Sequence, residues 1–437
     1  MKSNKNKYTN ILKKYNPLIL KAAENNISKN INSNMVLGET VSYVVAPVLF
    51  DFVYWILSEA KNQGIYRLYF FARDGYILYN IAKYINEKFM FQIDCRYLYT
   101  SRFASRVPSF HLLGNKSFDI ICEKKMFNSI RTVLQNISLN LDEQKHLINL
   151  LRLSNIDLDK ELNLKELESL KMQMISNNDF VTYVFDISKN AYSKTIQYFQ
   201  QEGLFDSVSM GYVDVGWRGT LQVFINRLIN KNLPGFYFGL FSSDFLTVKD
   251  NCFVYMFSNI NEHLFKAFFN NSLFECFCSA PDGMTVGYEY IGTKWEPSFS
   301  NKNNINLKSW YLKEQIELIL NYTKEILDLV DSYKNNKKMS KLLLRNLMAF
   351  PTKDEALLYG KYLFSDETNE ESLITLAPEF TKSDCIFLLT KHLRNTSKCA
   401  HKLSYWRFGS IQLSSINSCL KVLVWWYCFL AKLYKNK

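Results

Sequence analysis

Residues 67–78 read Arg-Leu-Tyr-Phe-Phe-Ala-Arg-Asp-Gly-Tyr-Ile-Leu, and this stretch decides the fold. An apolar run stops at a charged pair and a glycine, Arg73-Asp74-Gly75, and a helical pattern follows at once. This order is typical of a buried β-strand that leads into a helix in an open α/β sheet. Ligands bind at the carboxyl ends of such strands. The stretch therefore predicts an α/β fold with a binding site near Asp74.

A second copy of the arrangement lies at residues 210–220, which read Met-Gly-Tyr-Val-Asp-Val-Gly-Trp-Arg-Gly-Thr. Both predicted strand ends carry an aspartate, an arginine and glycine. Arginine suits phosphate, aspartate suits acid–base chemistry or metal binding, and glycine permits close approach of the backbone to a ligand. The two stretches together indicate a phosphorylated ligand, but they do not reveal the reaction.

Strand-like and helical patterns alternate along residues 37–300, which predicts an α/β, Rossmann-like domain with a mostly parallel sheet. Four strands of that sheet are expected near residues 67–72, 95–100, 208–215 and 235–241. A helical insertion is expected at about residues 105–205. Residues 1–36 are expected to be a polar, partly helical lead-in with little core, and residues 301–437 a helical C-terminal region.

The chain has 437 residues and a formal net charge of +12, which favours an anionic partner such as a phosphate ester, a nucleic acid or an acidic membrane surface. An AT-rich codon bias toward lysine would produce the same excess, and we do not expect nucleic acid as the partner. The nine cysteines include no C-x-x-C pair, and the five histidines include no H-x-x-x-H pattern. We therefore expect free thiols, a cytoplasmic protein and no histidine-based metal site.

Asp74 and Asp214 are the candidate catalytic residues, because each follows an apolar strand at the edge where ligands bind. Both are also the candidate ligands of Mg²⁺, the cofactor that we expect. Asp214 is better placed than Asp74 to be a nucleophile or a metal ligand. A structural alternative exists for Asp74, in which its carboxylate caps the helix that follows.

Neighbours of these aspartates are candidates for binding phosphate or substrate: Arg73, Gly75, Ser101, Arg102, Gly216, Trp217, Arg218, Gly219 and Thr220. Trp217 is a candidate for stacking on a sugar or base, and Thr220 for capping its helix and donating to a phosphate there. Ser101 and Arg102 follow another strand end, and their alternative role is the solvated start of a basic helix. Glu275 and Asp282 are candidate rim residues with acid–base or magnesium chemistry.

Four segments resemble a group of bacterial proteins described as predicted haloacid-dehalogenase-superfamily hydrolases: residues 68–75, 97–102, 213–220 and 279–283. The resemblance covers roughly residues 37–295. Such proteins accompany the glycosyltransferases of surface-polysaccharide synthesis. The resemblance therefore implies a phosphohydrolase or phosphotransferase, with a phosphorylated sugar or nucleotide sugar as ligand and a glycosyltransferase as partner.

The resemblance also bears on the chemistry of the first strand end. In phosphatases of this superfamily the strand ends in Asp-x-Asp-Gly-Thr, where the first aspartate attacks phosphorus and the second protonates the leaving group. Here Ala72 holds the first position, while Asp74 and Gly75 match the second aspartate and the glycine. Alanine cannot be a nucleophile. Larger members carry an additional N-terminal domain with Phe-Asp-x-Phe-Asp-Thr, and that motif is absent here.

Alternatives to an enzyme of this class stay open. One is a non-catalytic module that binds a sugar phosphate or nucleotide sugar and assists a glycosyltransferase. Another is a phosphoribosyltransferase-like enzyme, because an Arg-Asp-Gly loop precedes the loop from Asp214 to Thr220. A third is a scaffold at an anionic membrane surface, since residues 420–437 combine paired tryptophans with lysines. The same residues are also consistent with a helix that packs on the core. A peripheral position on the inner face of the membrane is expected only if residues 420–437 are a membrane anchor.

Overall fold

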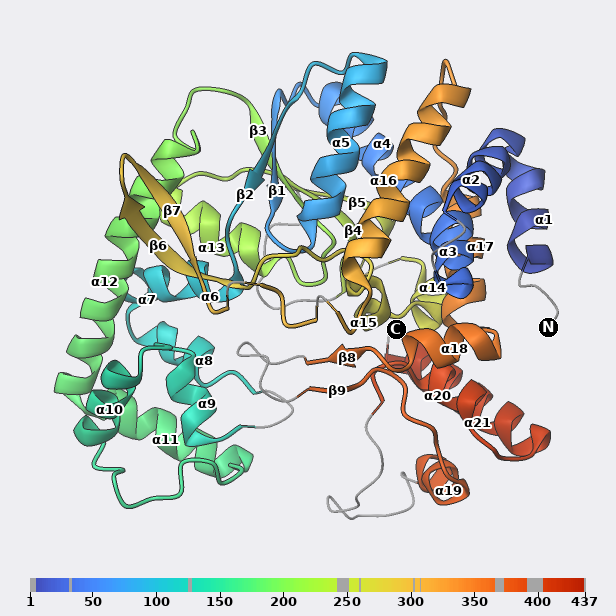
Figure 1. Cartoon of the computed structure of the whole chain (residues 1–437). Coiled ribbons are helices and arrows are strands. Elements are labelled where there is room, and N and C mark those ends of the chain that lie inside the picture. Colours follow the sequence, from blue (N-terminus) through green and yellow to red (C-terminus); the bar gives the residue numbers. More distant parts are fainter. Residues whose placement is uncertain are drawn as a thin grey trace.

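The structure is a computed structural model of the whole chain, and it describes residues 5–30, 34–124, 128–241, 251–258, 261–301, 303–306, 308–365, 373–390 and 404–435. Within these residues, helices surround a central sheet of parallel strands, and two small antiparallel strand pairs lie apart from it (Figure 1). The predicted α/β, Rossmann-like fold with a helical insertion and a helical C-terminal region is confirmed.

The central sheet has the strand order β2-β1-β3-β4-β5, and all of its neighbouring strands are parallel. The strands are β1 (Arg67–Phe71), β2 (Asp94–Leu98), β3 (Met210–Asp214), β4 (Gly235–Gly239) and β5 (Cys252–Phe257). The chain moves from β1 to β2 on one side of the sheet and from β3 to β5 on the other. The topological switch point therefore lies between β1 and β3, and ligands of doubly wound sheets bind there, outside the carboxyl ends of the strands.

β1, β3 and β4 are buried along their whole length, which explains their near-continuous apolar sequences. Successive side chains point to opposite faces, so Leu68 and Phe70 join one hydrophobic core while Tyr69 and Phe71 join another. The first face is covered by α4 (Ala46–Asn62), α5 (Gly75–Phe89) and α16 (Leu312–Leu329), and the second by α12 (Asn178–Gln201) and α13 (Thr220–Ile229). The sheet is thus a buried middle layer, and only the ends of its strands are left uncovered by these helices.

The chain between β2 and β3 forms the helical insertion. Its helices before α12 are α6 (Arg102–Arg106), α7 (Phe110–Leu113), α8 (Ser117–Ile121), α9 (Ile130–Gln135), α10 (Leu141–Leu150) and α11 (Leu164–Ser176). They share a core of their own, which includes Phe118, Leu147 and Phe180, and Phe224 of α13 joins it. α12 links this core to the sheet, because its first half packs in the insertion and its second half packs on β1 and β3 (Figure 1).

An antiparallel hairpin, β6 (Thr285–Ile291) and β7 (Lys294–Phe299), lies beside α12. Tyr288 anchors it, because its ring stacks on Tyr198 with 4.2 Å between centroids and its hydroxyl donates to the carbonyl oxygen of Tyr99 at 2.8 Å. The C-terminal region adds α17 (Lys337–Met348), α18 (Lys353–Tyr359), α19 (Lys382–Thr390), α20 (Arg407–Leu413), α21 (Ser418–Lys435) and the short pair β8 (Leu363–Phe364) and β9 (Ile374–Thr375).

The N-terminal segment expected to be a polar lead-in is helical and joins the core. It forms α1 (Lys5–Tyr15) and α2 (Pro17–Lys29), and Tyr8 and Leu12 are buried. The Tyr8 hydroxyl donates to the buried carboxylate of Glu355 in α18 at 2.5 Å. The expectation of little core in this segment is wrong, because its few apolar residues share helix faces that meet distant parts of the chain. The division of the chain into three domains stays a prediction.

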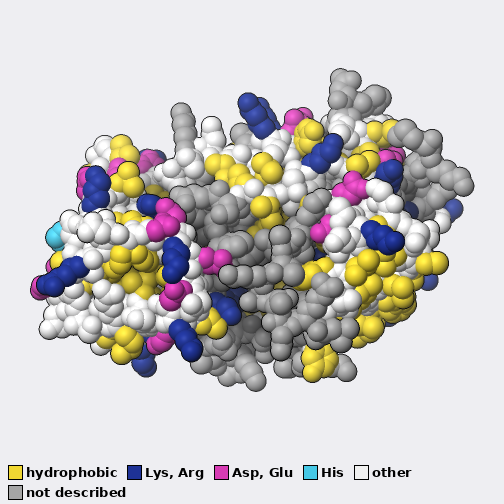
Figure 2. Space-filling model, turned by 90° about the horizontal axis from the view of Figure 1, so that it is seen from below, with side chains coloured by type: hydrophobic (Ala, Val, Ile, Leu, Met, Phe, Trp, Pro, Cys, Tyr) yellow, Lys and Arg dark blue, Asp and Glu magenta, His cyan; other side chains and the backbone are white. Residues whose placement is uncertain are grey.

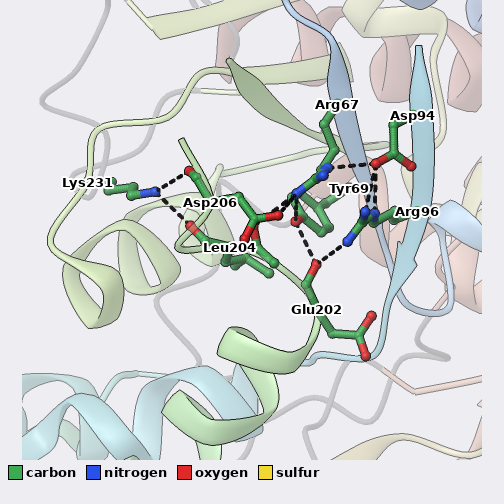
Figure 3. Close-up of polar contacts among 9 residues, drawn as sticks. Arg67, Tyr69, Asp94, Arg96, Glu202, Leu204, Asp206 and Lys231 are labelled. Atoms are coloured by element: carbon green, nitrogen blue, oxygen red, sulfur yellow. Dashed lines mark hydrogen bonds and ion pairs between the residues drawn. The ribbon is translucent and has the colours of Figure 1, made fainter. Parts of the chain in front are cut away.

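A network of polar groups holds the amino-terminal edge of the sheet (Figure 3). Arg67, at the start of β1, is 8% exposed and donates to Asp94 at 2.7 Å and to Asp206 at 2.6 Å. Arg96 in β2 donates to the same Asp94 carboxylate at 2.9 Å and to the carbonyl oxygen of Glu202 at 2.7 Å. These contacts tie the starts of β1 and β2 to the turn that leads into β3.

Within the described residues, one continuous helical run, Met35–Asn62, is long and apolar enough to cross a membrane. Most of it is buried inside the protein, where its residues join the core on the first face of the sheet.

Helix α21 carries the apolar run near the end of the chain. Val424, Cys428 and Phe429 are buried in the core, whereas Trp426 and Leu430 on the other side are 52% and 54% exposed. Figure 2 shows hydrophobic side chains gathered toward the end of the molecule where α21 lies in Figure 1. The helix therefore packs on the core and also presents an apolar face.

The lysines beside that apolar face are already engaged. The Lys421 ammonium donates to the carbonyl oxygen of Gln412 at 3.1 Å, and that of Lys432 donates to the carbonyl oxygen of Phe269 at 3.1 Å. Burial lowers the pKa of Lys432 to about 8. These two lysines thus serve the packing of α21 as well as its charge.

Candidate functional site

The end of β1 presents Arg73 and Asp74 at the switch point of the sheet. Arg73 has a φ of 68°, in the left-handed region that favours glycine, and its N–H donates to the Tyr97 hydroxyl at 2.9 Å. A non-glycine residue in that region costs of order 1 kcal/mol, and such strain collects at functional sites. Asp74 stands at the N-cap position of α5, yet its side chain makes no capping hydrogen bond. The structural alternative for Asp74, a helix cap, is therefore wrong.

The end of β3 presents Asp214, which is 7% exposed. Its carboxylate accepts hydrogen bonds from the backbone N–H groups of Val215 and Gly216. A Cβ atom on Gly216 would lie 2.1 Å from the carbonyl oxygen of Gly239, and its φ is 136°. Only glycine fits where this loop passes β4, so the turn that aims the two N–H groups at Asp214 depends on it.

Asp74 and Asp214 interact directly through their charges. Burial, followed by repulsion from Asp214, raises the pKa of Asp74 to about 7, while the charges of Arg73 and Arg102 act against the rise. Burial also raises the pKa of Asp214 to about 7, against the two backbone hydrogen bonds. Two carboxyl groups that repel each other in a buried place share a proton near neutral pH. The structure therefore brings together the acid pair that the two strand ends predict.

Arg102 joins the acid pair from the start of α6, because its charge acts on the pKa of both Asp74 and Asp214. It is exposed, so it stands on the solvent side of the pair. Ser101 beside it has a structural role, because its hydroxyl accepts from the N–H of Ala104 at 2.9 Å and donates to the carbonyl oxygen of Thr285 at 2.7 Å. Ser101 thus places Arg102 by capping α6 and tying it to the hairpin.

Trp217, Gly219 and Thr220 shape the loop after Asp214. The Trp217 indole N–H donates to Glu275 at 2.5 Å, and its ring packs against Phe269 with 5.2 Å between centroids. The half-buried ring thus packs on protein aromatics, and stacking on a sugar or base stays a prediction. Gly219 is the N-cap of α13 and Thr220 is its first residue, so the expectation that Thr220 caps the helix is wrong. Gly75, likewise, is the buried first residue of α5.

The two candidate rim residues lie at different places. Glu275 ends the short helix α15 (Asn271–Glu275), binds Trp217, and raises the pKa of Asp214 by its charge, behind burial. The charge of Asp282 instead contributes, behind burial, to the raised pKa of Tyr97 and Tyr99 at the end of β2. Burial raises the pKa of Asp282. Glu275 therefore belongs to the surroundings of the acid pair, and Asp282 to the neighbouring strand end.

Three residues near the site were not among the candidates. Cys278 is fully buried and acts electrostatically with both Asp74 and Asp214; burial raises its thiol pKa, so it is a neutral neighbour of the pair. Glu123 binds Arg218 at 2.9 Å and Arg106 at 3.3 Å. Arg106 lies one helical turn after Arg102, and that spacing is a signal in the sequence. Glu123 and Cys278 have no such local signal.

A cavity of about 510 Å³ lies on the other side of α6 from the arginines. α6, α12, the β6–β7 hairpin and residues 137–143 line it, and Phe103, Ala104 and Val107 form its side toward α6. It includes none of the predicted site residues.

No group of three or more histidine, cysteine, aspartate or glutamate side chains is arranged to hold a metal ion in the described part of the chain. Asp74 and Asp214 offer two carboxylates, and Mg²⁺ commonly binds one or two carboxylates together with substrate phosphate. The acid pair thus fits the metal only in company with a phosphate ligand, and Mg²⁺ stays a prediction. The eight cysteines in the described residues form no disulfide.

Comparison with known proteins adds no family to this description: no protein-family model matches the chain, and no curated protein matches it. The resemblance to haloacid-dehalogenase-superfamily hydrolases stays a prediction from the quoted segments.

Proposed function

We propose that this protein binds a phosphate ester at the switch point of its sheet and transfers or hydrolyses the phosphoryl group by acid–base chemistry. The observation that supports the proposal is the acid pair of half-buried Asp74 and buried Asp214, each with a pKa of about 7. General acids and bases work best when their pKa lies near the operating pH. Arg73 and Arg102 beside the pair supply positive charge for phosphate oxygens.

The two aspartates take different roles in this proposal. Backbone N–H groups stabilise the ionised form of Asp214, so Asp214 is the base that accepts the proton of the attacking water or hydroxyl group. Asp74 has no capping hydrogen bond and is held toward its neutral form by burial and by Asp214, so Asp74 donates a proton to the leaving oxygen. This assignment agrees with the resemblance, in which Asp74 matches the leaving-group acid. Ala72 stands two positions before Asp74, where the resemblance places the nucleophile, and alanine cannot perform covalent catalysis.

The substrate class follows from the resemblance alone: a sugar phosphate or nucleotide sugar used in surface-polysaccharide synthesis, with a glycosyltransferase as partner. In the metal-assisted form of the proposal, which replaces the acid–base roles above, ionised Asp74 and Asp214 would hold Mg²⁺ and the metal would supply positive charge to the phosphate. The non-catalytic binding module remains the second candidate, and Ala72 at the nucleophile-like position favours it.

The test is phosphate release, measured with and without Mg²⁺ on a panel of sugar phosphates and nucleotide sugars. Asp214→Asn should lower kcat by about 10²- to 10⁴-fold, the usual contribution of a general base. Asp159→Asn makes the same change in an exposed ion pair with Arg131 and is the matched control. Ligands that bind with no turnover by the wild-type protein would favour the binding module instead.

The membrane-surface hypothesis for residues 420–437 also remains a proposal, supported by the exposed apolar side of α21. Trp426→Ala with Leu430→Ala should lower co-sedimentation with anionic vesicles while leaving the fold intact, because both side chains are more than half exposed. Equal co-sedimentation of the double variant and the wild type would leave α21 as a packing helix only.

A further inference from the structure

A cluster of three arginines around one glutamate lies next to the acid pair. The Glu123 carboxylate, just after α8, binds Arg218 of the β3–α13 loop at 2.9 Å and Arg106 of α6 at 3.3 Å. The side chains of Glu123 and Arg106 are 21% and 13% exposed, and that of Arg218 is 51% exposed. A single carboxylate therefore faces two guanidinium groups, and one of them is half exposed to solvent.

The cluster has more positive charge than Glu123 can neutralise. Arg102 acts on Arg106 as a like charge: burial, then Arg102, lowers the pKa of Arg106 to about 10, and Glu123 only partly offsets this. The Arg106 Nε atom is buried and has no hydrogen-bond partner among the described residues. The guanidinium carbon of Arg106 lies 5.7 Å from the ring centroid of Phe224, which fixes one side of the group. A buried donor without a partner is costly, and an anionic ligand would supply one.

Arg102 connects this cluster to the acid pair, since its charge acts on Asp74 and Asp214 as well as on Arg106. Two places for an anion thus lie side by side. The first is bounded by Arg73, Arg102 and the acid pair, and the second by Arg106 and Arg218. Glu123 fills the second place with a carboxylate of the protein itself.

We propose that Arg106 and Arg218 bind a second phosphate group, so that the ligand of this site is a diphosphate ester, and that Glu123 holds this place until the ligand displaces it. The inference rests on the proposed function for the position of the first phosphate. It adds the substrate class. Two linked phosphates would occupy both anion places, one on each side of Arg102, whereas a phosphate monoester would occupy only the place beside the acid pair. An anion of the protein that occupies its own anion site lowers affinity without closing the site.

Calorimetric titration of the full chain with inorganic phosphate and with inorganic pyrophosphate tests the inference. Pyrophosphate should bind more tightly. Arg218→Ala should weaken pyrophosphate binding by about 10-fold, as expected for loss of a hydrogen bond to a charged group, and leave phosphate binding nearly unchanged. Glu123→Gln should strengthen pyrophosphate binding. Arg131→Ala removes the same charge from an exposed ion pair in the insertion and is the matched control.

Equal affinities for phosphate and pyrophosphate, or equal losses in Arg218→Ala and Arg131→Ala, would overturn the inference. A nucleoside diphosphate and a short prenyl diphosphate form two further arms. Tighter binding of either supports a diphosphate ester and identifies its source, and weak binding of both overturns it. Titrations repeated in Asp214→Asn separate the two proposals. If the variant still prefers diphosphates and the wild-type protein turns none of them over, the proposed enzyme activity is rejected and the proposed diphosphate ligand is retained.

Discussion

At the amino edge of the sheet Arg67 meets two carboxylates, Asp94 and Asp206, whereas at the carboxyl edge Asp74 and Asp214 meet each other. Burial lowers the pKa of Arg67, but its hydrogen bonds outweigh burial and raise it. Burial raises the pKa of Asp94, but its bonds to Arg96 and Arg67 outweigh burial and lower it. Arg67 and Asp94 are thus both held in their ionised forms.

The carboxyl edge has the opposite balance. Burial is the largest influence on both Asp74 and Asp214, and neither arginines nor hydrogen bonds outweigh it. The five-stranded sheet thus has paired, stabilised charges at the amino ends of its strands and mutually repelling carboxyl groups at their carboxyl ends. Unfavourable charge burial that survives in a folded protein is typical of functional sites, so this difference supports the proposal that the carboxyl edge binds the ligand.

The largest effect on stability is expected at the amino edge. Arg67→Met should lower the free energy of unfolding by about 1.5–3 kcal/mol, because it removes the hydrogen bonds of a buried guanidinium to Asp94 and Asp206. Urea denaturation measures this value. Arg131→Met, in an exposed pair with Asp159, should cost less than about 1 kcal/mol. Similar losses in both variants would show that the amino edge is no special anchor.

Asp74→Asn should change the free energy of unfolding in the opposite direction and stabilise the protein. Replacing one member of the acid pair removes the repulsion and the cost of burying a charge, so we expect a gain of about 1–2 kcal/mol in unfolding free energy at pH 8. Asp94→Asn, the same substitution at the amino edge, should be destabilising. Destabilisation in both variants would contradict the difference between the two edges.

The gain in Asp74→Asn should depend on pH. The folded-state pKa of Asp74 is about 7 and lies above its unfolded value, so the native state holds the extra proton. Stability from this group is therefore present below about pH 4 and is lost as the pH rises to about 7. The advantage of Asn should be absent near pH 4 and complete above pH 7 in urea titrations. Asp94 should behave in reverse, with its contribution lost as the pH falls.

The sheet and the acid pair are accessible to prediction from sequence because their signals are local. Apolar runs that stop at Asp74 or Asp214 identify strand ends, and parallel strands must present those ends at one edge. The partners of Ser101 and Trp217 were not predictable, because Thr285 and Glu275 are distant in the chain.

The same limit explains the two larger failures. Tyr8 is buried in the core and its hydroxyl donates to Glu355 of α18, and no pattern near residue 8 predicts a contact so distant in the chain. Glu123 likewise is an ordinary acidic residue after a short helix until the insertion folds over α6 and meets Arg106. Long-range packing, not local propensity, determines both roles.

The smallest effect is expected from Arg96, and it distinguishes burial from mere charge pairing at the amino edge. Arg96 bonds the same Asp94 oxygen as Arg67, at 2.8 Å, but the side chains of Arg96 and Asp94 are 33% and 43% exposed. Solvent therefore screens the pair, and Arg96→Ala should cost about 0.5–1 kcal/mol, an amount that 1 M salt reduces further. Urea denaturation at low and high salt gives both numbers. A loss as large as that of Arg67→Met, unchanged by salt, would mean that the whole network and not the buried Arg67 holds the strand starts together.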